Sequence, residues 1–317
     1  MTIDPAHLLV TGANGVLGRH LLRTLSASGG SGPAAAVVRS EGAADTVRSL
    51  PEPGRPDVHV VDYQDVEGLT KAMQGRRFVV HLVGILKESK HSRYVDAHER
   101  ATAAVAEAAA RAGVERIVYL SILGSEPGSS NACLASKGRA EQALLASSVP
   151  ATVIRLPMVL GEGDLASRAL RGEAQAHILP LLDGGTSLEQ PIDAEDVVQA
   201  ILQALGRPEL SGRALDLAGP ESLAAKELVL RAAALYGNRP RFVPVPAALA
   251  RLAVRVLARF MEAPPLTEPM LEVLLHDDRI DPLPAARALG IELTPLDAML
   301  THRVGPDAPA KGKEKQP

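Results

Sequence analysis

The chain has 317 residues, of which 46% are hydrophobic and 22% are charged, so its composition is that of a folded globular protein. The formal net charge is -3 and only 2% of the residues are aromatic, which argues against nucleic acid as a partner. The single cysteine excludes an internal disulfide, and no cysteine–histidine spacing indicates a zinc site. We therefore expect a compact cytoplasmic protein in a reducing environment.

Short apolar strands alternate with helices through the first half of the chain. The strands are continuous runs rich in Val, Ile and Leu, as expected where helices cover both faces of a parallel sheet. This alternation predicts an α/β fold with a Rossmann-type, doubly wound parallel sheet. The predicted strands are His7–Thr11, Ala34–Arg39, Val58–Asp62, Phe78–Val83, Arg116–Ser121 and Thr152–Leu156, and the predicted helices are Val16–Ser26, Val66–Gln74, Tyr94–Arg111 and Ala135–Ala146.

The alternation loosens beyond Pro157, where we expect a smaller C-terminal lobe. Asp193 is a suitable N-cap for a helix over Ala194–Leu205, and Gly206 is a suitable end for it. The later predicted elements are a strand over Ala214–Ala218 and helices over Ser222–Tyr236, Ala247–Glu262 and Thr267–His276. We assign residues 1–160 to the core, with 188–220 returning to the sheet, 161–304 mainly to a partly interleaved lobe, and 305–317 to a disordered tail.

A glycine-rich turn stands between the first predicted strand and helix, in the order Thr11-Gly12-Ala13-Asn14-Gly15-Val16-Leu17-Gly18. Gly12 permits a tight turn, Gly15 lets the backbone approach a diphosphate, and Gly18 lets the helix pack on the strand. The helix N-terminus also offers backbone N–H groups to an anion. In this strand–turn–helix context the spacing predicts a dinucleotide-binding turn, with contacts from Gly12, Asn14, Gly15, Val16, Leu17 and Gly18.

The end of the second predicted strand bears on which dinucleotide is bound. An acidic residue there would bind the ribose 2′-hydroxyl of NAD, whereas an arginine accommodates the 2′-phosphate of NADP. The chain reads Val38-Arg39-Ser40-Glu41, so the planar guanidinium of Arg39 favours NADP. Glu41 keeps NAD open as the alternative, and Arg39 could instead be an ordinary solvated strand end.

The TGxxGxxG pattern resembles the extended and atypical branches of the short-chain dehydrogenase/reductase superfamily. The segments 81–85 (HLVGI), 121–124 (SILG) and 217–221 (LAGPE) are most similar to the nucleotide-binding accessory subunit of respiratory complex I and its NmrA-like bacterial relatives. The resemblance spans roughly residues 6–300 and therefore concerns the whole fold. It implies further cofactor contacts from Asp62, Leu82, Val83, Gly84, Ser121, Lys137 and Pro157.

The same resemblance implies an active site with a Tyr-x-x-x-Lys pair on one helix face and a hydroxyl residue after the fifth strand. Lys137 is present, but Cys133 stands at the tyrosine position, and Ile122 and Leu123 stand where the hydroxyl residue is expected. Cys133 could be a proton donor whose pKa Lys137 lowers, a redox-sensitive thiol, or a small half-buried hydrophobic residue. The replacements imply NAD(P) binding with weak or no dehydrogenase turnover.

Two other tyrosines and one histidine bear on the missing proton donor. Tyr119 lies inside a predicted strand and Tyr94 opens a helix, so the sequence gives neither of them the role of the missing tyrosine. His81 ends the fourth predicted strand, where it could serve either as an acid/base or as a buried structural residue. An NAD(P)H-dependent oxidoreductase or epimerase with a non-standard proton donor therefore stays open as an alternative.

A basic row marks the predicted helix over Ala247–Glu262. Arg251, Arg255 and Arg259 recur every four residues among Ala, Leu, Val, Phe and Met, which indicates a membrane surface, a partner protein or a solvated face. No stretch reaches the roughly 20 uninterrupted apolar residues of a membrane span. A membrane-peripheral accessory or assembly factor linked to the respiratory chain or quinones is therefore the third functional class.

Overall fold

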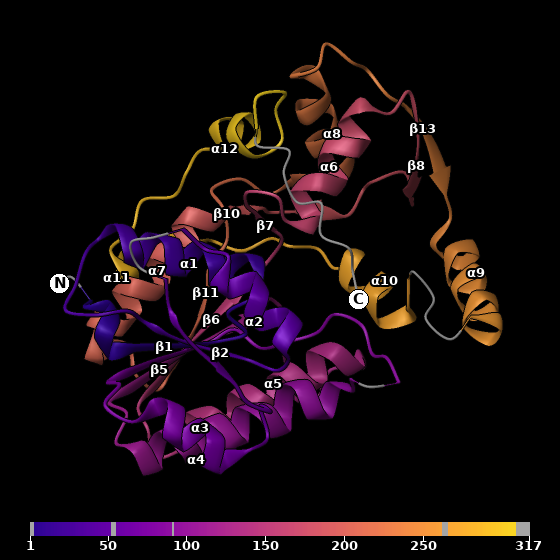
Figure 1. The fold of residues 1–317 in the computed structure, drawn as a ribbon. Helices are drawn as coiled ribbons and strands as arrows, with labels where there is room; N and C mark the ends of the chain where they lie inside the picture. Colours follow the sequence, from indigo (N-terminus) through magenta and orange to yellow (C-terminus); the bar gives the residue numbers. More distant parts are fainter. Residues whose placement is uncertain (1–2, 52–54, 91, 262–265, 309–317) are drawn as a thin grey trace. The chain divides into compact units, whose positions relative to one another are not determined.

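The computed structural model describes residues 3–51, 55–90, 92–261 and 266–308 (Figure 1). The chain divides into two compact units. The first comprises Met1–Leu156, Val197–Leu217 and Leu283–Ile291, and the second comprises Pro157–Asp196, Ala218–Pro282 and Glu292–Pro317. Each unit is therefore built from segments that are distant in the sequence.

The first unit contains a seven-stranded sheet in which every pair of neighbouring strands is parallel. The strand order is β11-β6-β5-β4-β1-β2-β3, so the order reverses between β1 and β4. This arrangement confirms the predicted Rossmann-type fold, and ligands of such sheets bind where the order reverses, at the carboxyl ends of the strands. The strands are β1 (Leu8–Thr11), β2 (Ala35–Val38), β3 (Asp57–Val60), β4 (Phe78–His81), β5 (Arg116–Ile122), β6 (Ala151–Leu156) and β11 (Arg213–Asp216).

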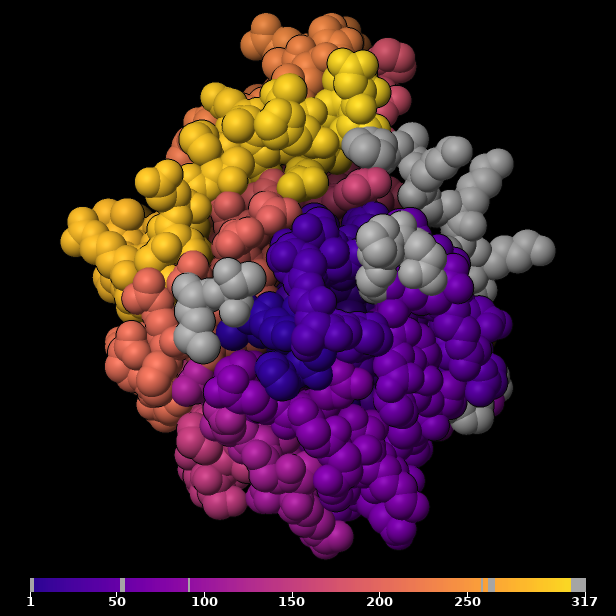
Figure 2. All heavy atoms as spheres, turned by 60° about the vertical axis from the view of Figure 1, so that its left-hand side comes forward, coloured from indigo at the N-terminus to yellow at the C-terminus, as the bar shows by residue number. Residues whose placement is uncertain are grey.

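Helices cover both faces of this sheet (Figure 1). One face packs against α3 (Val66–Met73), α4 (Ala101–Ala112) and α5 (Ala132–Leu145), in a core that runs from Leu9 to Val153. The opposite face carries α1 (Val16–Ala27), α7 (Ala194–Gly206) and α11 (Leu283–Leu289). Figure 2 brings the N-terminal segment forward, in indigo at the surface of this unit. Two short 3-10 helices, Pro5–His7 and Pro208–Leu210, precede β1 and β11.

Several boundaries in the first unit differ from the sequence-based prediction. An unpredicted helix, α2 (Glu41–Arg48), follows β2 because the Ser40 side chain caps it. The predicted strand over Val58–Asp62 is shifted toward the N-terminus, since β3 ends at Val60. The predicted helix over Tyr94–Arg111 begins with a π-helical segment, Val95–Arg100, before α4. Helix α5 starts three residues earlier than predicted because Asn131 accepts two backbone N–H groups as its cap.

The second unit has its own core, formed by α6 (Leu165–Gln175), α8 (Ala225–Ala234) and α12 (Leu296–Arg303). The predicted helix over Ser222–Tyr236 is shorter, because its first residues form a strand. The remaining elements are β7 (Val159–Leu160), β8 (Ile178–Leu182), β9 (Leu188–Glu189), β10 (Ile192–Asp193), β12 (Leu223–Ala224), β13 (Arg241–Val245), α9 (Ala247–Phe260) and α10 (Glu268–Leu274).

The described part of the C-terminal segment ends in a turn. Residues 305–308, assigned from composition to a disordered tail, form a turn in which the Ala308 N–H donates to the Gly305 carbonyl at 3.1 Å. The Arg171 guanidinium also donates to the Ala308 carbonyl at 3.2 Å. Residues 309–317 of the predicted tail lie outside the described residues. Among the described helices, none has the length and apolar character needed to cross a membrane.

Candidate functional site

The fold constrains the three glycines of the turn after β1 to different degrees. Gly12 has a φ of +68°, and a Cβ there would lie 3.1 Å from the Leu82 carbonyl carbon. A Cβ on Gly18 would lie 2.8 Å from the backbone of Ala13, so this glycine is needed for helix packing. Gly15 has an ordinary φ of −62°, and a Cβ there would approach only the Gly12 carbonyl oxygen, at 3.3 Å. The fold itself therefore requires Gly12 and Gly18 more than Gly15.

The N-terminus of α1 lacks a side-chain cap. Its N-cap is Gly15, which provides no side-chain hydrogen bond, whereas Ser40, Asp65 and Asn131 cap α2, α3 and α5. The first N–H groups of a helix have no intrahelical acceptor and carry the positive end of its dipole. Gly15 and Asn14 are also exposed. The turn therefore fits a diphosphate, whose oxygens would accept these N–H groups.

Tyr63, to which no local sequence pattern points, supports the glycine turn through its hydroxyl. The Gly12 N–H donates to the Tyr63 hydroxyl at 3.1 Å, and that hydroxyl donates to the Val37 carbonyl at 3.3 Å. Burial raises the pKa of Tyr63 to about 12, so the phenol stays protonated and can serve both bonds. Tyr63 thus connects the glycine turn to β2 through the Val37 carbonyl.

Three charged side chains lie near the end of β2, and two of them, Glu41 and Asp62, have partners in the structure. Glu41, the residue that kept NAD open, forms an ion pair with Arg48 at 3.0 Å within α2. Arg39 follows β2 directly and its side chain is exposed. Asp62 is also exposed, and its carboxylate accepts the Gln64 N–H at 2.8 Å. The exposed cation beside the glycine turn is therefore the group best suited to a phosphate.

His81, at the end of β4, is completely buried. Its Nδ1 lies 2.7 Å from the Thr11 hydroxyl and its Nε2 lies 3.1 Å from the Thr102 hydroxyl, while its ring stacks on Tyr119. Burial, together with the charge of Lys137, lowers the pKa of His81 to about 3. The ring is therefore neutral near pH 7 and ties β1, β4 and α4 together, which is a structural role.

Lys137, on α5, is only 5% exposed and forms a pair with a tyrosine from another element. Its Nζ donates to the Tyr119 hydroxyl at 3.0 Å and to the Leu120 carbonyl at 3.0 Å, and it lies 4.5 Å from the Tyr119 ring centroid. A Cβ on Gly84 would lie 3.0 Å from the same Nζ, so Gly84 leaves space for the ammonium group. The predicted contacts Gly84 and Lys137 therefore lie together at the end of β4.

Cys133 occupies the position one turn before Lys137 and is buried. Its thiol donates to the Ile85 carbonyl, with a sulfur–oxygen distance of 3.6 Å. Burial raises the pKa of Cys133 to about 11, and this outweighs the lowering effect of Lys137. Of the three alternatives for Cys133, a thiol whose pKa Lys137 lowers is therefore the least favoured, because the desolvation of the thiolate is the larger effect.

Tyr94 and His98 hold the loop that follows β4. The Tyr94 hydroxyl donates to the Leu86 carbonyl at 2.9 Å, and His98 Nε2 lies 3.1 Å from both backbone N and O of Ile85. The Glu88 carboxylate accepts the Tyr94 N–H at 2.8 Å. Together with the Cys133 thiol, these contacts fix residues 85–88 against the π-helical segment. Residues 85–88 therefore occupy the space beside Cys133, which stands at the tyrosine position.

The end of β5 carries hydroxyl groups, although not at the expected positions. Leu123 is buried and Ile122 is half-buried, so neither supplies a polar group. The Ser121 hydroxyl instead donates to the Ser125 hydroxyl at 3.2 Å, and both side chains are buried. Ser125 was not singled out from the sequence, since its proximity to Ser121 depends on the turn after β5.

Comparison with known proteins identifies the family. A family model described as NAD(P)H-binding matches residues 12–208, which include Gly12–Gly18 of the glycine turn and every strand of the sheet except β1 and β11. The chain belongs to this NAD(P)H-binding family. The match covers more than half of the chain, and the groups that line the carboxyl ends of β1, β4 and β5 lie within it.

Two curated relatives and one solved structure are similar to this NAD(P)H-binding chain. An Arabidopsis thaliana mitochondrial NADH dehydrogenase [ubiquinone] 1 alpha subcomplex subunit 9 is 29% identical over 76% of the chain, which spans 61% of that protein. A Caulobacter vibrioides ceramide reductase is 29% identical over 75% of the chain and 73% of its own length. An Escherichia coli NADPH-dependent quinone oxidoreductase complexed with NADPH shares the fold, with a TM-score of 0.70, 19% identity, and coverage of 93% and 99%. The predicted resemblance to the complex I subunit is confirmed.

The remaining predicted contacts of this NAD(P)H-binding chain lie in three places. Val16 and Leu17 form the first turn of α1, and Leu82 and Val83 follow β4, where the Leu82 N–H donates to the Thr11 carbonyl at 3.2 Å. Pro157 begins the second unit. All of these stay predictions as cofactor contacts.

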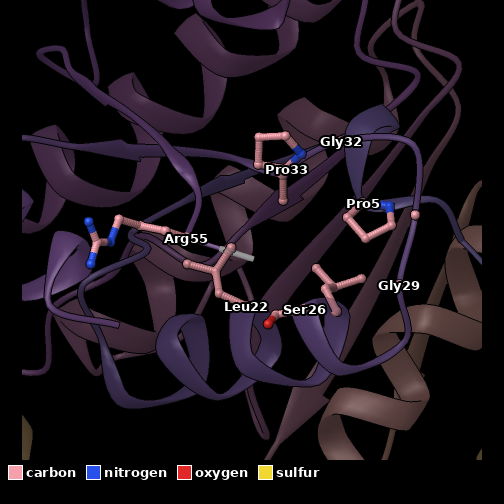
Figure 3. Close-up of a pocket in the computed structure, with 10 residues that line it drawn as sticks. Pro5, Leu22, Ser26, Gly29, Gly32, Pro33 and Arg55 are labelled. Atoms are coloured by element: carbon pink, nitrogen blue, oxygen red, sulfur yellow. The ribbon is translucent and has the colours of Figure 1, made fainter. Parts of the chain in front are cut away.

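A separate surface hollow lies at the amino ends of the strands, whereas the glycine turn lies at their carboxyl ends. It has a volume of about 420 Å³ and is lined by residues that include Pro5, Leu22, Gly29, Pro33 and Arg55 (Figure 3). Pro5 precedes β1 and Pro33 precedes β2, so the hollow adjoins the amino ends of these strands. Dinucleotides bind such sheets at the carboxyl ends, and the hollow is therefore not the cofactor site.

Proposed function

We propose that this protein binds NADP(H) in preference to NAD(H) and has weak or no dehydrogenase turnover. The observation that carries this proposal is the contrast between two parts of the site. The turn before α1 fits a diphosphate, whereas the tyrosine position holds a buried Cys133 whose raised pKa keeps the thiol protonated. A binding site without an adequate proton donor fits a cofactor-dependent structural or sensing role.

The cofactor would be held by the glycine turn, the end of β2 and Lys137. The α1 N–H groups would take the diphosphate, and the exposed Arg39 guanidinium would take the 2′-phosphate. The bound nicotinamide would supply or accept a hydride. Gly84 and Lys137, which lie together at the end of β4, would adjoin its ribose.

Calorimetry on the purified chain tests the cofactor preference. We expect tighter binding of NADPH than of NADH, and Arg39→Asp should weaken NADPH binding by roughly tenfold to a hundredfold while leaving NADH binding nearly unchanged. Arg48→Asp is a matched control, since Arg48 is also an exposed arginine, in the helix that follows β2, but its guanidinium is paired with Glu41. Equal affinities for the two cofactors in the wild-type chain would refute the preference.

When a hydride adds to the carbon of a carbonyl group, the oxygen becomes negatively charged and must receive a proton. Cys133 is a poor source because its thiol donates to Ile85 and its pKa is near 11. His81 is enclosed, and its neutral ring contacts two threonine hydroxyls. Because acid and polarising groups commonly contribute about 10²–10⁴-fold each, their replacement should leave little turnover.

A substrate screen that follows the absorbance of NADPH tests this proposal on catalysis. We expect slow or undetectable consumption with carbonyl substrates, no change in cofactor affinity for Cys133→Ala, and weaker cofactor binding for Lys137→Ala. Thermal melting of each variant identifies losses that come from unfolding. Rapid turnover that disappears in Cys133→Ala would overturn the proposal and make Cys133 the proton donor.

The second candidate is an NAD(P)H-dependent oxidoreductase or epimerase with a non-standard donor. The Ser121–Ser125 hydroxyl pair favours it, because this pair ends β5 near the usual place of the polarising hydroxyl. Under this candidate, turnover would persist in Cys133→Ala but fall sharply in Ser121→Ala. The names of two similar proteins, ceramide reductase and quinone oxidoreductase, make apolar carbonyl compounds and quinones the first substrates to screen.

We also propose a cytoplasmic location with peripheral membrane contact through the helix that carries Arg251, Arg255 and Arg259. Similarity to a complex I subunit supports an accessory or assembly role near the respiratory chain. Fractionation of cells that express the tagged chain tests this location. We expect a portion of the protein in the membrane fraction, released by high salt, and a wholly membrane-free distribution would contradict the proposal.

A further inference from the structure

Helix α9 presents an apolar face that the rest of its unit does not cover. Leu249, Leu252, Val256 and Phe260 are 59%, 58%, 49% and 81% exposed. Their spacing of three or four residues places them in one row along the helix, since an α-helix turns once in 3.6 residues. Large apolar side chains that gather in this way on a soluble domain mark an interaction surface.

The opposite side of the same helix is buried. Val254 is only 5% exposed and Ala247 is also buried, so the helix has a definite inner side. Val254 lies two residues from both Leu252 and Val256, which corresponds to about 200° around the helix. The exposed row therefore faces away from the contacts that hold α9 in its unit.

The three arginines border this apolar row. Arg251, Arg255 and Arg259 each immediately precede one of the exposed apolar residues, so their row lies about 100° around the helix. Arg255 forms an ion pair with Glu268 at 2.7 Å, and residues 247–261 contain no acidic side chain. The helix thus combines an exposed apolar row with an edge of three arginines, of which Arg255 is paired with Glu268.

We propose that α9 docks on anionic phospholipid, with the apolar row among the upper acyl chains and the arginines at the level of the phosphates. This inference deepens the membrane contact proposed above by naming the lipid and the inserting side chains. Arginine stems can lie along apolar surface while their guanidinium groups reach the phosphates. A second copy of the chain is a poorer occupant, because a two-fold contact along this face would bring the same three arginines together.

Flotation of the full chain with lipid vesicles tests this docking. We expect the protein to float with vesicles that contain phosphatidylglycerol at low salt, and to stay unbound with pure phosphatidylcholine. The double variant Arg251→Gln/Arg259→Gln should bind about 25-fold more weakly, since each arginine near an anionic surface contributes about fivefold. Phe260→Ser should weaken binding at least about tenfold, because burial of its ring is lost.

Controls separate docking from folding and from the cofactor site. Leu165→Ser removes a 67% exposed apolar side chain from α6 and should leave flotation unchanged. All variants should bind NADPH as the wild type does, so failure of lipid docking and failure of cofactor binding are distinguishable. Equal flotation with both vesicle types, or unchanged flotation of the arginine and Phe260 variants, would overturn the proposal. A change in oligomeric mass in Phe260→Ser would instead assign the face to self-association.

Discussion

The different surroundings of Gly15 and Gly18 predict that alanine at these two positions affects different properties. At Gly18 an added Cβ would lie 2.8 Å from the backbone of Ala13, closer than a methyl group can approach. Overpacking of this kind costs about 1–3 kcal/mol, and the helical preference for alanine over glycine recovers at most about 1 kcal/mol. Because the opposing atoms are backbone, the clash outweighs the preference. We expect Gly18→Ala to lower the free energy of unfolding by about 1–2 kcal/mol.

At Gly15 the same substitution should spare the fold and impair the ligand. The backbone conformation suits any residue, and the added methyl group meets only a carbonyl oxygen at 3.3 Å. The methyl group would instead displace a bound diphosphate from an α1 N–H group, and a lost charge-assisted hydrogen bond costs about 1.5–3 kcal/mol. We therefore expect Gly15→Ala to melt like the wild type and bind NADPH at least about tenfold more weakly.

Urea unfolding and calorimetry on the same two preparations measure both quantities. The two variants should change different properties, one stability and the other cofactor binding, so each serves as the control for the other. If Gly15→Ala bound NADPH as tightly as the wild type, the diphosphate would not lie against this turn. If Gly18→Ala were as stable as the wild type, the close approach of α1 to Ala13 would not limit packing.

Three further predictions concern side chains that are wholly or partly buried. Tyr63→Phe should lower stability by about 1–3 kcal/mol and weaken binding of NADPH and NADH alike, because the Gly12 N–H and the Val37 carbonyl both lose a partner. The pKa of His81 is lowered from 6.5 to about 3, so the unfolded state binds the proton first and stability falls as pH drops below about 6.5. Comparison of wild type and His81→Asn by urea unfolding at pH 7 and pH 5 should show about 2 kcal/mol less pH dependence in the variant, and equal dependence would refute the burial argument. Burial raises the pKa of Glu189 to about 8, so its stabilising proton is lost as pH rises through 8, and Glu189→Gln should stabilise the chain more at pH 9 than at pH 6.

The sequence by itself determined the parts of this protein that depend on local pattern. Apolar runs alternating with helices were sufficient to predict the parallel sheet, since a strand buried on both faces needs an uninterrupted apolar run. The glycine turn was recognisable because turn, close approach and helix start are all set within Gly12–Gly18. The positions of Lys137 and Cys133 were also readable, since one turn of a helix separates them. The helix at Glu41–Arg48 was missed, although Ser40 is a recognisable N-cap.

Only the tertiary structure decided what surrounds these groups. Tyr63 reaches Gly12 across 51 positions and Tyr119 reaches Lys137 across 18, and no local pattern encodes either distance. The three alternatives for Cys133 stayed open in the sequence because the nearby Lys137 is visible there, whereas the burial that dominates the pKa of the thiol is not. Likewise, the arginine row of α9 and its apolar neighbours were visible in the sequence, but the exposure of these neighbours was not. Burial and long-range contact arise from the packing of the whole chain, and the free energy of a charge depends on that packing more than on its neighbours in sequence.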